Sequence, residues 1–154
     1  MNSVTFRAAR REDVPAIVRL LADDVLGAGR ERAVDPLPDS YWRAWEAIAA
    51  RAGCTLLLAI DDRDVVVGCL QLDLLPGLSQ QGMWRGQVEG VRVAAGQRGR
   101  GLGAAMLRHA ISLARTAGCG SVQLTSNAAR TDARRFYERL GFVASHVGMK
   151  LDLK

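Results

Sequence analysis

The sequence predicts a single α/β domain over residues 1–154, built on a mixed central sheet of about six to seven strands with helices on both faces. Apolar stretches typical of strands alternate along the chain with segments whose apolar residues recur every three to four positions, as in amphipathic helices. A length of 154 residues suits one domain with a sizeable core. A glycine-rich loop also joins a strand to a helix, which is common in α/β proteins.

The N-terminal third is expected to hold one strand and two helices. Residues 4–7 form a short strand, and residues 12–26 form a helix with an apolar stripe that ends before Gly27. A proline-containing connection follows, and Ser40 then caps a second helix over residues 41–52.

Three strands are expected in the middle of the chain. Residues 55–60 and 65–74 form a hairpin around the acid-rich turn at residues 61–64, and residues 86–93 form the next strand. Gly90 lies within that strand, where a glycine often marks a bulge or a close approach of backbone.

The last third continues the alternation. Residues 102–117 form a helix with one apolar face, residues 121–125 a strand, and residues 132–140 another helix. Residues 142–143 and 147–153 are expected to supply two final strands.

The loop before residue 102 has the chemistry of a phosphate site. Its glycines leave backbone N–H groups unshielded, and the following helix offers unpaired N–H groups and the positive end of its dipole to an anion. The dinucleotide fingerprint is excluded because Met106 stands where its third glycine is needed. The mononucleotide loop is excluded because the only lysines are Lys150 and Lys154.

Three blocks of sequence carry a family resemblance. The loop pattern is Arg98-x-x-Gly101-x-Gly103, and downstream stands Arg135-Phe136-Tyr137-Glu138-Arg139-Leu140-Gly141-Phe142. The third block is Phe6-Arg7-Ala8-Ala9 followed by Glu12-Asp13. Together these blocks resemble the GNAT family of N-acetyltransferases. The resemblance implies the GNAT fold and transfer of an acetyl group from acetyl-CoA to a primary amine, by direct attack in a ternary complex.

The resemblance also assigns residues to the co-substrate acetyl-CoA. The loop would bind the pyrophosphate, the strand before it would pair with the pantetheine arm, and residues after the next strand would make further contacts. These residues are Val91, Arg92, Val93, Arg98, Gly99, Arg100, Gly101, Leu102, Gly103, Ala104, Asn127, Arg130 and Arg134. Either Arg130 or Arg134 would take the 3′-phosphate of CoA.

Glu89 and Tyr137 are the catalytic candidates. An alkyl ammonium must lose a proton before it attacks, and Glu89 stands where many family members keep a base. Strand alternation is expected to place Glu89 on the same face as Val91 and Val93. Tyr137 matches the family tyrosine that protonates the departing thiolate. The alternatives are a surface glutamate paired with a neighbouring arginine, and a tyrosine that only lines the CoA groove.

The charge distribution bears on the acceptor. Residues 92–139 carry nine arginines and two acids, whereas residues 12–73 carry twelve acids and six arginines. The acidic half would form the acceptor side in the family layout, so a cationic small-molecule or peptide amine is expected. No nucleic-acid partner is expected, because the basic segment coincides with a phosphate loop and holds few aromatic residues.

Cysteines, histidines and apolar stretches indicate which metal sites, disulfides and cellular location to expect. Three cysteines without paired spacing predict neither a zinc site nor disulfides, and two isolated histidines predict no metal. Without an apolar leader or membrane span, a cytoplasmic protein is expected. The sequence is compatible with a homodimer. The alternative functions are a CoA-binding sensor without turnover and a basic nucleic-acid-binding domain, and the identity of the acceptor is not encoded in any motif.

Overall fold

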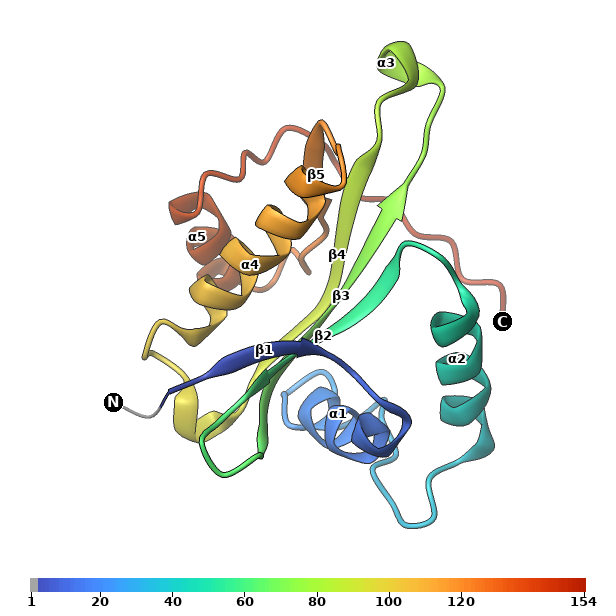
Figure 1. Ribbon diagram of the computed structural model, residues 1–154, viewed down its shortest axis with the longest axis vertical. Coiled ribbons are helices and arrows are strands. Elements are labelled where there is room, and N and C mark those ends of the chain that lie inside the picture. The colour runs from blue at the N-terminus through green and yellow to red at the C-terminus, as the bar shows by residue number, and fades with distance from the viewer. Residues whose placement is uncertain (1–2) are drawn as a thin grey trace.

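The computed structural model describes residues 3–154, which form one five-stranded mixed sheet with helices on both faces (Figure 1). Neighbouring strands are antiparallel from β1 to β4, whereas β4 and β5 are parallel. The strands are β1 (Thr5–Ala8), β2 (Cys54–Ile60), β3 (Val66–Leu75), β4 (Arg85–Val93) and β5 (Ser121–Leu124). The α/β class and the mixed sheet are confirmed, with fewer strands than predicted.

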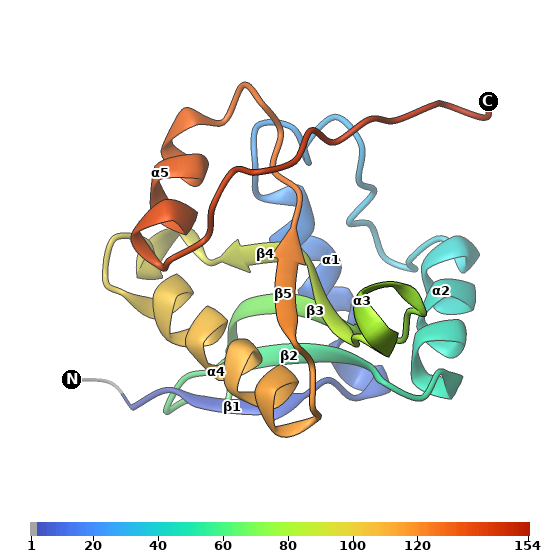
Figure 2. The same ribbon diagram turned by 90° about the horizontal axis from the view of Figure 1, so that it is seen from above.

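Helices α1 and α2 lie on one side of the sheet and α4 and α5 on the other (Figures 1 and 2). None of the helices formed by residues 3–154 combines the length and the apolar character needed to cross a membrane. The helices are α1 (Val14–Ala22), α2 (Asp39–Ala50), α3 (Ser79–Gly82), α4 (Leu102–Thr116) and α5 (Thr131–Arg139), with short 3-10 turns η1 (Arg11–Asp13) and η2 (Ala95–Gln97).

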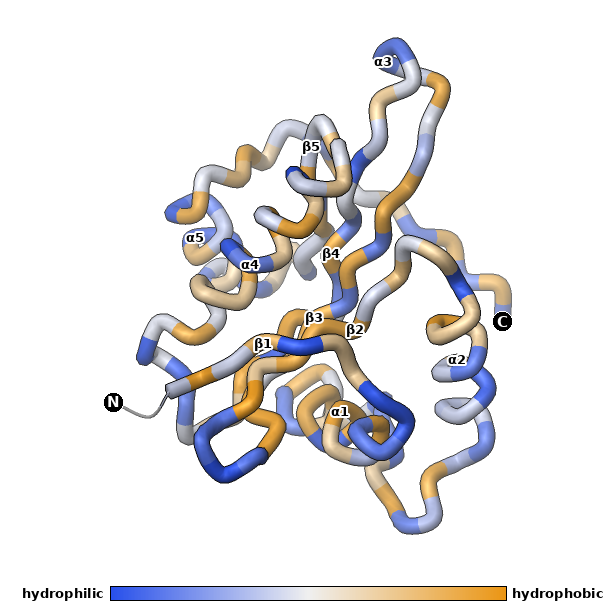
Figure 3. The backbone as a smooth tube through the Cα atoms, viewed as in Figure 1, coloured by the Kyte–Doolittle hydropathy of each residue, from blue (hydrophilic) through white to orange (hydrophobic). Residues whose placement is uncertain are grey.

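Two apolar layers hold the helices against the sheet. Leu57 of β2 packs with Met106 and Leu107 of α4, while its neighbour Leu58 points to the opposite face and packs with Ile17 of α1. Strand alternation therefore gives each face of β2 its own core. Figure 3 shows the hydrophobic residues gathered along the central strands.

Helix α1 is shorter than predicted. It ends at Ala22 instead of residue 26, and Val25, expected on its apolar stripe, is 95% exposed. The chain turns at Asp23 and Asp24, and the carboxylate of Asp24 binds arginines from two distant segments. These ion pairs hold the chain in this turn, and the helix ends before it.

The two final strands predicted over residues 142–143 and 147–153 are wrong. Residues 142–154 form no strand, and residues 146–154 make no backbone hydrogen bond within the described chain. This tail passes the end of β5 and runs away from the body of the molecule (Figure 2). Alternating apolar residues form a strand only where a neighbouring edge accepts their backbone hydrogen bonds, and within residues 3–154 the tail pairs with no such edge.

Candidate active site

The site begins where β4 and β5 separate. Their parallel pairing covers only residues 85–88 of β4 and 121–124 of β5, so the end of β4 has no β5 partner. The backbone on that side of residues 89–93 therefore has no strand partner and is available to an extended ligand, although the carbonyl oxygens of Val91 and Val93 accept hydrogen bonds from the side chains of Arg92 and Arg98.

A β-bulge interrupts β4 at the same place. Cys69 of β3 pairs with Arg92, but Gln71, two positions further along β3, pairs with Glu89 three positions away on β4. The extra residue lies at Gly90, whose φ of +61° falls in the left-handed region that glycine tolerates. The bulge expected at Gly90 is therefore confirmed.

The bulge reverses the faces of the residues that follow it. Val91 and Val93 pack against the core under α4, whereas Arg92 forms an ion pair with Asp24 on the opposite side. The prediction that Glu89 shares a face with Val91 and Val93 is wrong, because the inserted residue shifts the two-residue alternation by one. Glu89 shares the α1 side with Arg92.

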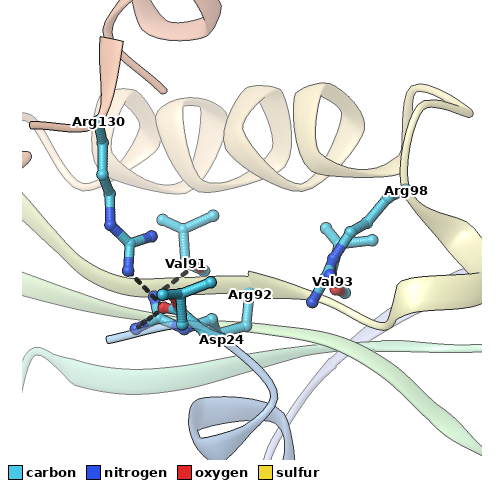
Figure 4. Close-up of a pocket in the computed structure, with 7 residues that line it drawn as sticks. Asp24, Val91, Arg92, Val93, Arg98 and Arg130 are labelled. Carbon is cyan, nitrogen blue, oxygen red and sulfur yellow. Dashed lines mark hydrogen bonds and ion pairs between the residues drawn. The ribbon is translucent and has the colours of Figure 1, made fainter. Parts of the chain in front are cut away.

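A cleft of about 290 Å³ opens at this split (Figure 4). Its walls come from the segment after α1, from the end of β4, from the loop before α4 and from the start of α5. The lining residues are Asp24, Val25, Val91, Arg92, Val93, Arg98 and Arg130. Sequence reasoning missed Asp24 and Val25, since only the fold brings the end of α1 to the end of β4.

Asp24 joins three of these segments. Its Oδ2 accepts a hydrogen bond from Arg130 and lies 3.1 Å from Nη2 of Arg92 (Figure 4). Partial burial raises the pKa of Asp24, but the hydrogen bond from Arg130, the N–H of Leu26 and the charges of the two arginines together bring that pKa below its usual value. Asp24 is therefore ionised at neutral pH.

Arg98 bridges the end of β4 to the same segment. Its Nε donates to the carbonyl oxygen of Val93 at 3.0 Å, and its Nη2 donates to the carbonyl oxygen of Asp23 at 2.8 Å. The guanidinium therefore holds the start of the glycine loop against the end of β4 and the segment that follows α1.

The loop itself leaves room for a ligand. Gly99 and Gly101 have φ of +72° and +83°, and a Cβ on either would meet no atom within 4 Å. Gly101 is the N-cap of α4, so the unpaired N–H groups of the first helical turn follow it directly. Gly103 differs, because a Cβ there would lie 3.3 Å from Cζ of Phe136, and it allows α4 and α5 to pack closely.

Tyr137 lies on α5 among aromatic rings. Its ring contacts Phe136 and Phe142 edge to face, with centroids 5.2 and 5.9 Å apart. Burial raises the pKa of Tyr137, although the charges of Arg92 and Arg130 act in the opposite direction. The phenol is therefore protonated at neutral pH, and its oxygen has no hydrogen-bond partner within residues 3–154.

Glu89 stays outside the lining of the cleft, on the exposed surface of β4. It forms no ion pair with any residue of the described chain, so pairing with Arg85 or Arg92 is not seen. Burial raises the pKa of the nearby Cys54 thiol to about 11, and the hydrogen bond to Asp73 and the charges of Asp73 and Glu89 add to this shift.

Two further candidates have structural partners. Oδ1 of Asn127 accepts a hydrogen bond from the N–H of Ala129 at 2.9 Å and so shapes the turn after β5. Nε of Arg134 lies 2.9 Å from Oε1 of Glu138, one helical turn away on α5.

Comparison with known proteins identifies the family. The family model described as "Acetyltransferase (GNAT) family" matches residues 16–142, which is most of the chain. The chain belongs to the GNAT family. A Bacillus halodurans C-125 protein described as a transcriptional regulator has 44% identity and a TM-score of 0.95, over 98% of this chain and 100% of that one. A Trypanosoma brucei acetyltransferase has 28% identity and a TM-score of 0.78, over 98% of this chain and 100% of that one.

Two relatives are named for their substrates. Glucosamine 6-phosphate N-acetyltransferase of Trypanosoma brucei brucei is 36% identical over 57% of this chain and 58% of its own length. Aminoalkylphosphonate N-acetyltransferase of Salmonella typhimurium is also 36% identical, over 53% of this chain and 52% of its own length. The chain thus spans between half and three fifths of each relative.

Replacing Asp24 by Asn should lower the free energy of unfolding at neutral pH by about 1–3 kcal/mol, because Arg92 and Arg130 lose their shared anion. The pKa of Asp24 is depressed in the folded state, so its contribution is present above about pH 4 and is lost as the pH falls through the folded pKa. The variant should therefore lose less stability than the wild type on acidification, as measured by urea unfolding across pH.

Asp23→Asn is the matched control, because that carboxylate is more than half exposed and pairs with Arg98 at the surface. Equal effects of the two substitutions, or an unchanged acid response in Asp24→Asn, would contradict the assignment.

Proposed function

We propose that this GNAT protein transfers the acetyl group of acetyl-CoA to a primary amine, by direct attack within a ternary complex. The observation that carries the proposal is the split between β4 and β5, which exposes strand backbone beside a glycine loop at the start of a helix. An acyl-CoA has the matching parts, namely an extended amide-containing arm and a pyrophosphate.

The backbone of residues 91–93 is proposed to pair with the pantetheine amides and to polarise the thioester carbonyl. The pyrophosphate would lie on the glycine loop, where the N–H groups of Leu102, Gly103 and Ala104 are unpaired helix donors. The side chain of Arg100 and the backbone of Gly99 complete this cradle, while Asn127, Arg130 and Arg134 are proposed to contact the remainder of CoA.

Glu89 is proposed to accept the ammonium proton through water, which frees the nitrogen lone pair. The nitrogen then bonds to the carbonyl carbon, the carbon–sulfur bond breaks, and its electron pair leaves with sulfur. The nitrogen releases its second proton to solvent, which gives the neutral amide. Tyr137 is proposed to donate its phenolic proton to that thiolate and to regain a proton from solvent. Its raised pKa favours this role, since the phenol stays protonated until the reaction needs it.

Direct attack is favoured over an acetylated cysteine. None of the three cysteines lines the cleft, and burial raises the pKa of each thiol. The thiolate that a covalent route requires is therefore scarce at neutral pH.

The charges of the chain bear on the chemical class of the acceptor amine. The acidic surplus of residues 12–73 predicts a cationic acceptor, yet several of those acids are already paired with arginine, namely Asp13, Asp24, Asp61 and Asp73. The cleft contains three arginines and one carboxylate. Polyamines and amines bearing phosphate or phosphonate should therefore be compared directly, with release of CoA thiol as the signal.

Acetyl-CoA should raise the melting temperature, by an amount equivalent to roughly 2.7 kcal/mol at one hundred times Kd. Gly101→Val should abolish this shift by placing a side chain in the open space of the loop. Gly118→Val is the matched control, because Gly118 ends the same helix with φ of +87° and equally open surroundings. Both variants carry the same backbone strain, so loss of the ligand shift in both would refute the loop assignment.

Glu89→Gln should lower kcat/KM by about 10²–10⁴-fold and change the acidic limb of its pH profile, while the Kd for acetyl-CoA stays the same. Steady-state kinetics with thiol detection, combined with calorimetry, would separate rate from binding. Glu12→Gln removes an equal charge from η1 and serves as the control. It should leave kcat/KM and the Kd for acetyl-CoA unchanged. A wild-type pH profile in Glu89→Gln would mean that another group is the base.

Tyr137→Phe should lower kcat by about 10²–10⁴-fold with little change in acetyl-CoA affinity or stability, because its hydroxyl makes no protein hydrogen bond within residues 3–154. An acyl donor with a more acidic thiol should restore much of the rate. Tyr41→Phe removes the other tyrosine hydroxyl, which bonds Glu31, and should retain full activity. If the rate and the affinity for acetyl-CoA fall by the same factor, Tyr137 only lines the CoA groove and does not donate the proton.

The same measurements decide between the alternatives. A CoA-binding sensor would show the thermal shift without thiol release for any amine. A nucleic-acid-binding domain would bind DNA with a steep salt dependence and ignore acetyl-CoA. The description of the Bacillus halodurans relative makes the DNA measurement worthwhile.

A further inference from the structure

The α1 side of the sheet changes from apolar to polar along β3 and β4. Cys69 of β3 packs in the core under α1, but the next two residues of β3 on the same face are Gln71 and Asp73. Directly opposite them on β4 stand Glu89 and Gln87. Hydrogen-bonding side chains therefore continue this face of the sheet where the apolar core ends.

Gln71 is the accessible member of this group on β3. Every residue from Val67 to Asp73 is buried except Gln71, which is partly exposed. Gln71 and Glu89 form a cross-strand pair, which brings their Cβ atoms to within about 4.5–5.5 Å of each other. Glu89 is exposed. A molecule that reaches Glu89 therefore also reaches the side chain of Gln71.

Asp73 fixes the orientation of the Gln71 amide. Nε2 of Gln71 donates to Oδ2 of Asp73 at 2.8 Å, and Oδ1 of Asp73 lies 3.1 Å from Nη1 of Arg51. Asp73 is only 6% exposed. A carboxylate paired with a cation only accepts hydrogen bonds, so the amide must turn its NH₂ group toward Asp73. Oε1 of Gln71 is left as an acceptor, and no residue of the described chain donates to it.

We propose that Oε1 of Gln71 accepts a hydrogen bond from the acceptor amine, and that Asp73 is the positioning residue that presents this oxygen. The inference rests on the proposed acetyl transfer, in which Glu89 takes the ammonium proton through water. An ammonium group has three N–H donors, so one can bond Gln71 while the proton of another passes to that water.

The orientation of the amide matters for the attack itself. An amide oxygen accepts from the ammonium and from the neutral amine alike, and it leaves the nitrogen lone pair free for the carbonyl carbon. A flipped amide would donate its N–H to that lone pair and would compete with the attack. The hydrogen bond to Asp73 excludes the flipped state.

A second pair of glutamines on the same face provides a contrast. Nε2 of Gln123 donates to Oε1 of Gln87 at 2.7 Å, so these two amides bond each other. Gln87 stands opposite Asp73, and Gln123 stands opposite Gln87 on β5. Gln123 is thus a glutamine of the same polar face that is not paired with Glu89.

Gln71→Met tests the contact, because methionine keeps the length of the side chain and removes both amide groups. The KM for the amine should rise by about 10–100-fold, with kcat and the Kd for acetyl-CoA within a few-fold of the wild type. Gln123→Met is the matched control and should leave all three unchanged. The probe is whichever of spermidine, glucosamine 6-phosphate and 2-aminoethylphosphonate gives the highest kcat/KM by thiol release.

Asp73→Asn tests the positioning role, because asparagine both donates and accepts and so permits either orientation of the Gln71 amide. It should raise the same KM in the wild-type background and have no further effect in Gln71→Met, since Asp73 acts through Gln71. Circular dichroism and thermal unfolding verify that each variant is folded.

The outcomes separate this inference from the proposed function. Thiol release by the wild type with an unchanged amine KM in Gln71→Met would overturn the inference and leave acetyl transfer in place. The same rise in KM in Gln123→Met would also overturn it. Multiplying effects of Asp73→Asn and Gln71→Met would refute the positioning role. A wild type that releases no thiol with any of the three amines would overturn both proposals.

Discussion

The separation of β4 from β5 is the constraint on which the site depends. Parallel pairing stops after four residues, and the bulge at Gly90 redirects the remainder of β4. Without the bulge, Arg92 would face the core under α4 and could not reach Asp24. The end of β4 is thus left without a β5 partner, and one inserted residue places a cation on the face opposite to α4.

Ion pairs then hold the edges of the split together. Asp24 binds Arg92 from β4 and Arg130 from the start of α5, while Arg98 secures Asp23 next to it. Three segments far apart in sequence are fixed by two adjacent carboxylates. The shortened end of α1 follows from the same contacts, since Asp24 reaches both arginines only after the helix has turned.

β5 shapes the site through the edge that faces β4. That edge pairs with β4 over four residues and then leaves it, where the cleft opens. The turn after β5 carries Asn127 and Arg130, and Arg130 lines the cleft. One short strand therefore positions one wall of the site.

Local signals in the sequence were sufficient for the α/β class, the order of most elements, the glycine loop and the bulge at Gly90, because periodicity and glycine geometry act within a few residues. They could not reveal that Asp24 meets Arg92 and Arg130, since ion pairs between distant segments exist only in the folded chain. The faces of Val91 and Glu89 required the register across β3. The tail shows the same limit: its alternation specifies a strand, but only tertiary structure decides which edge, if any, receives it.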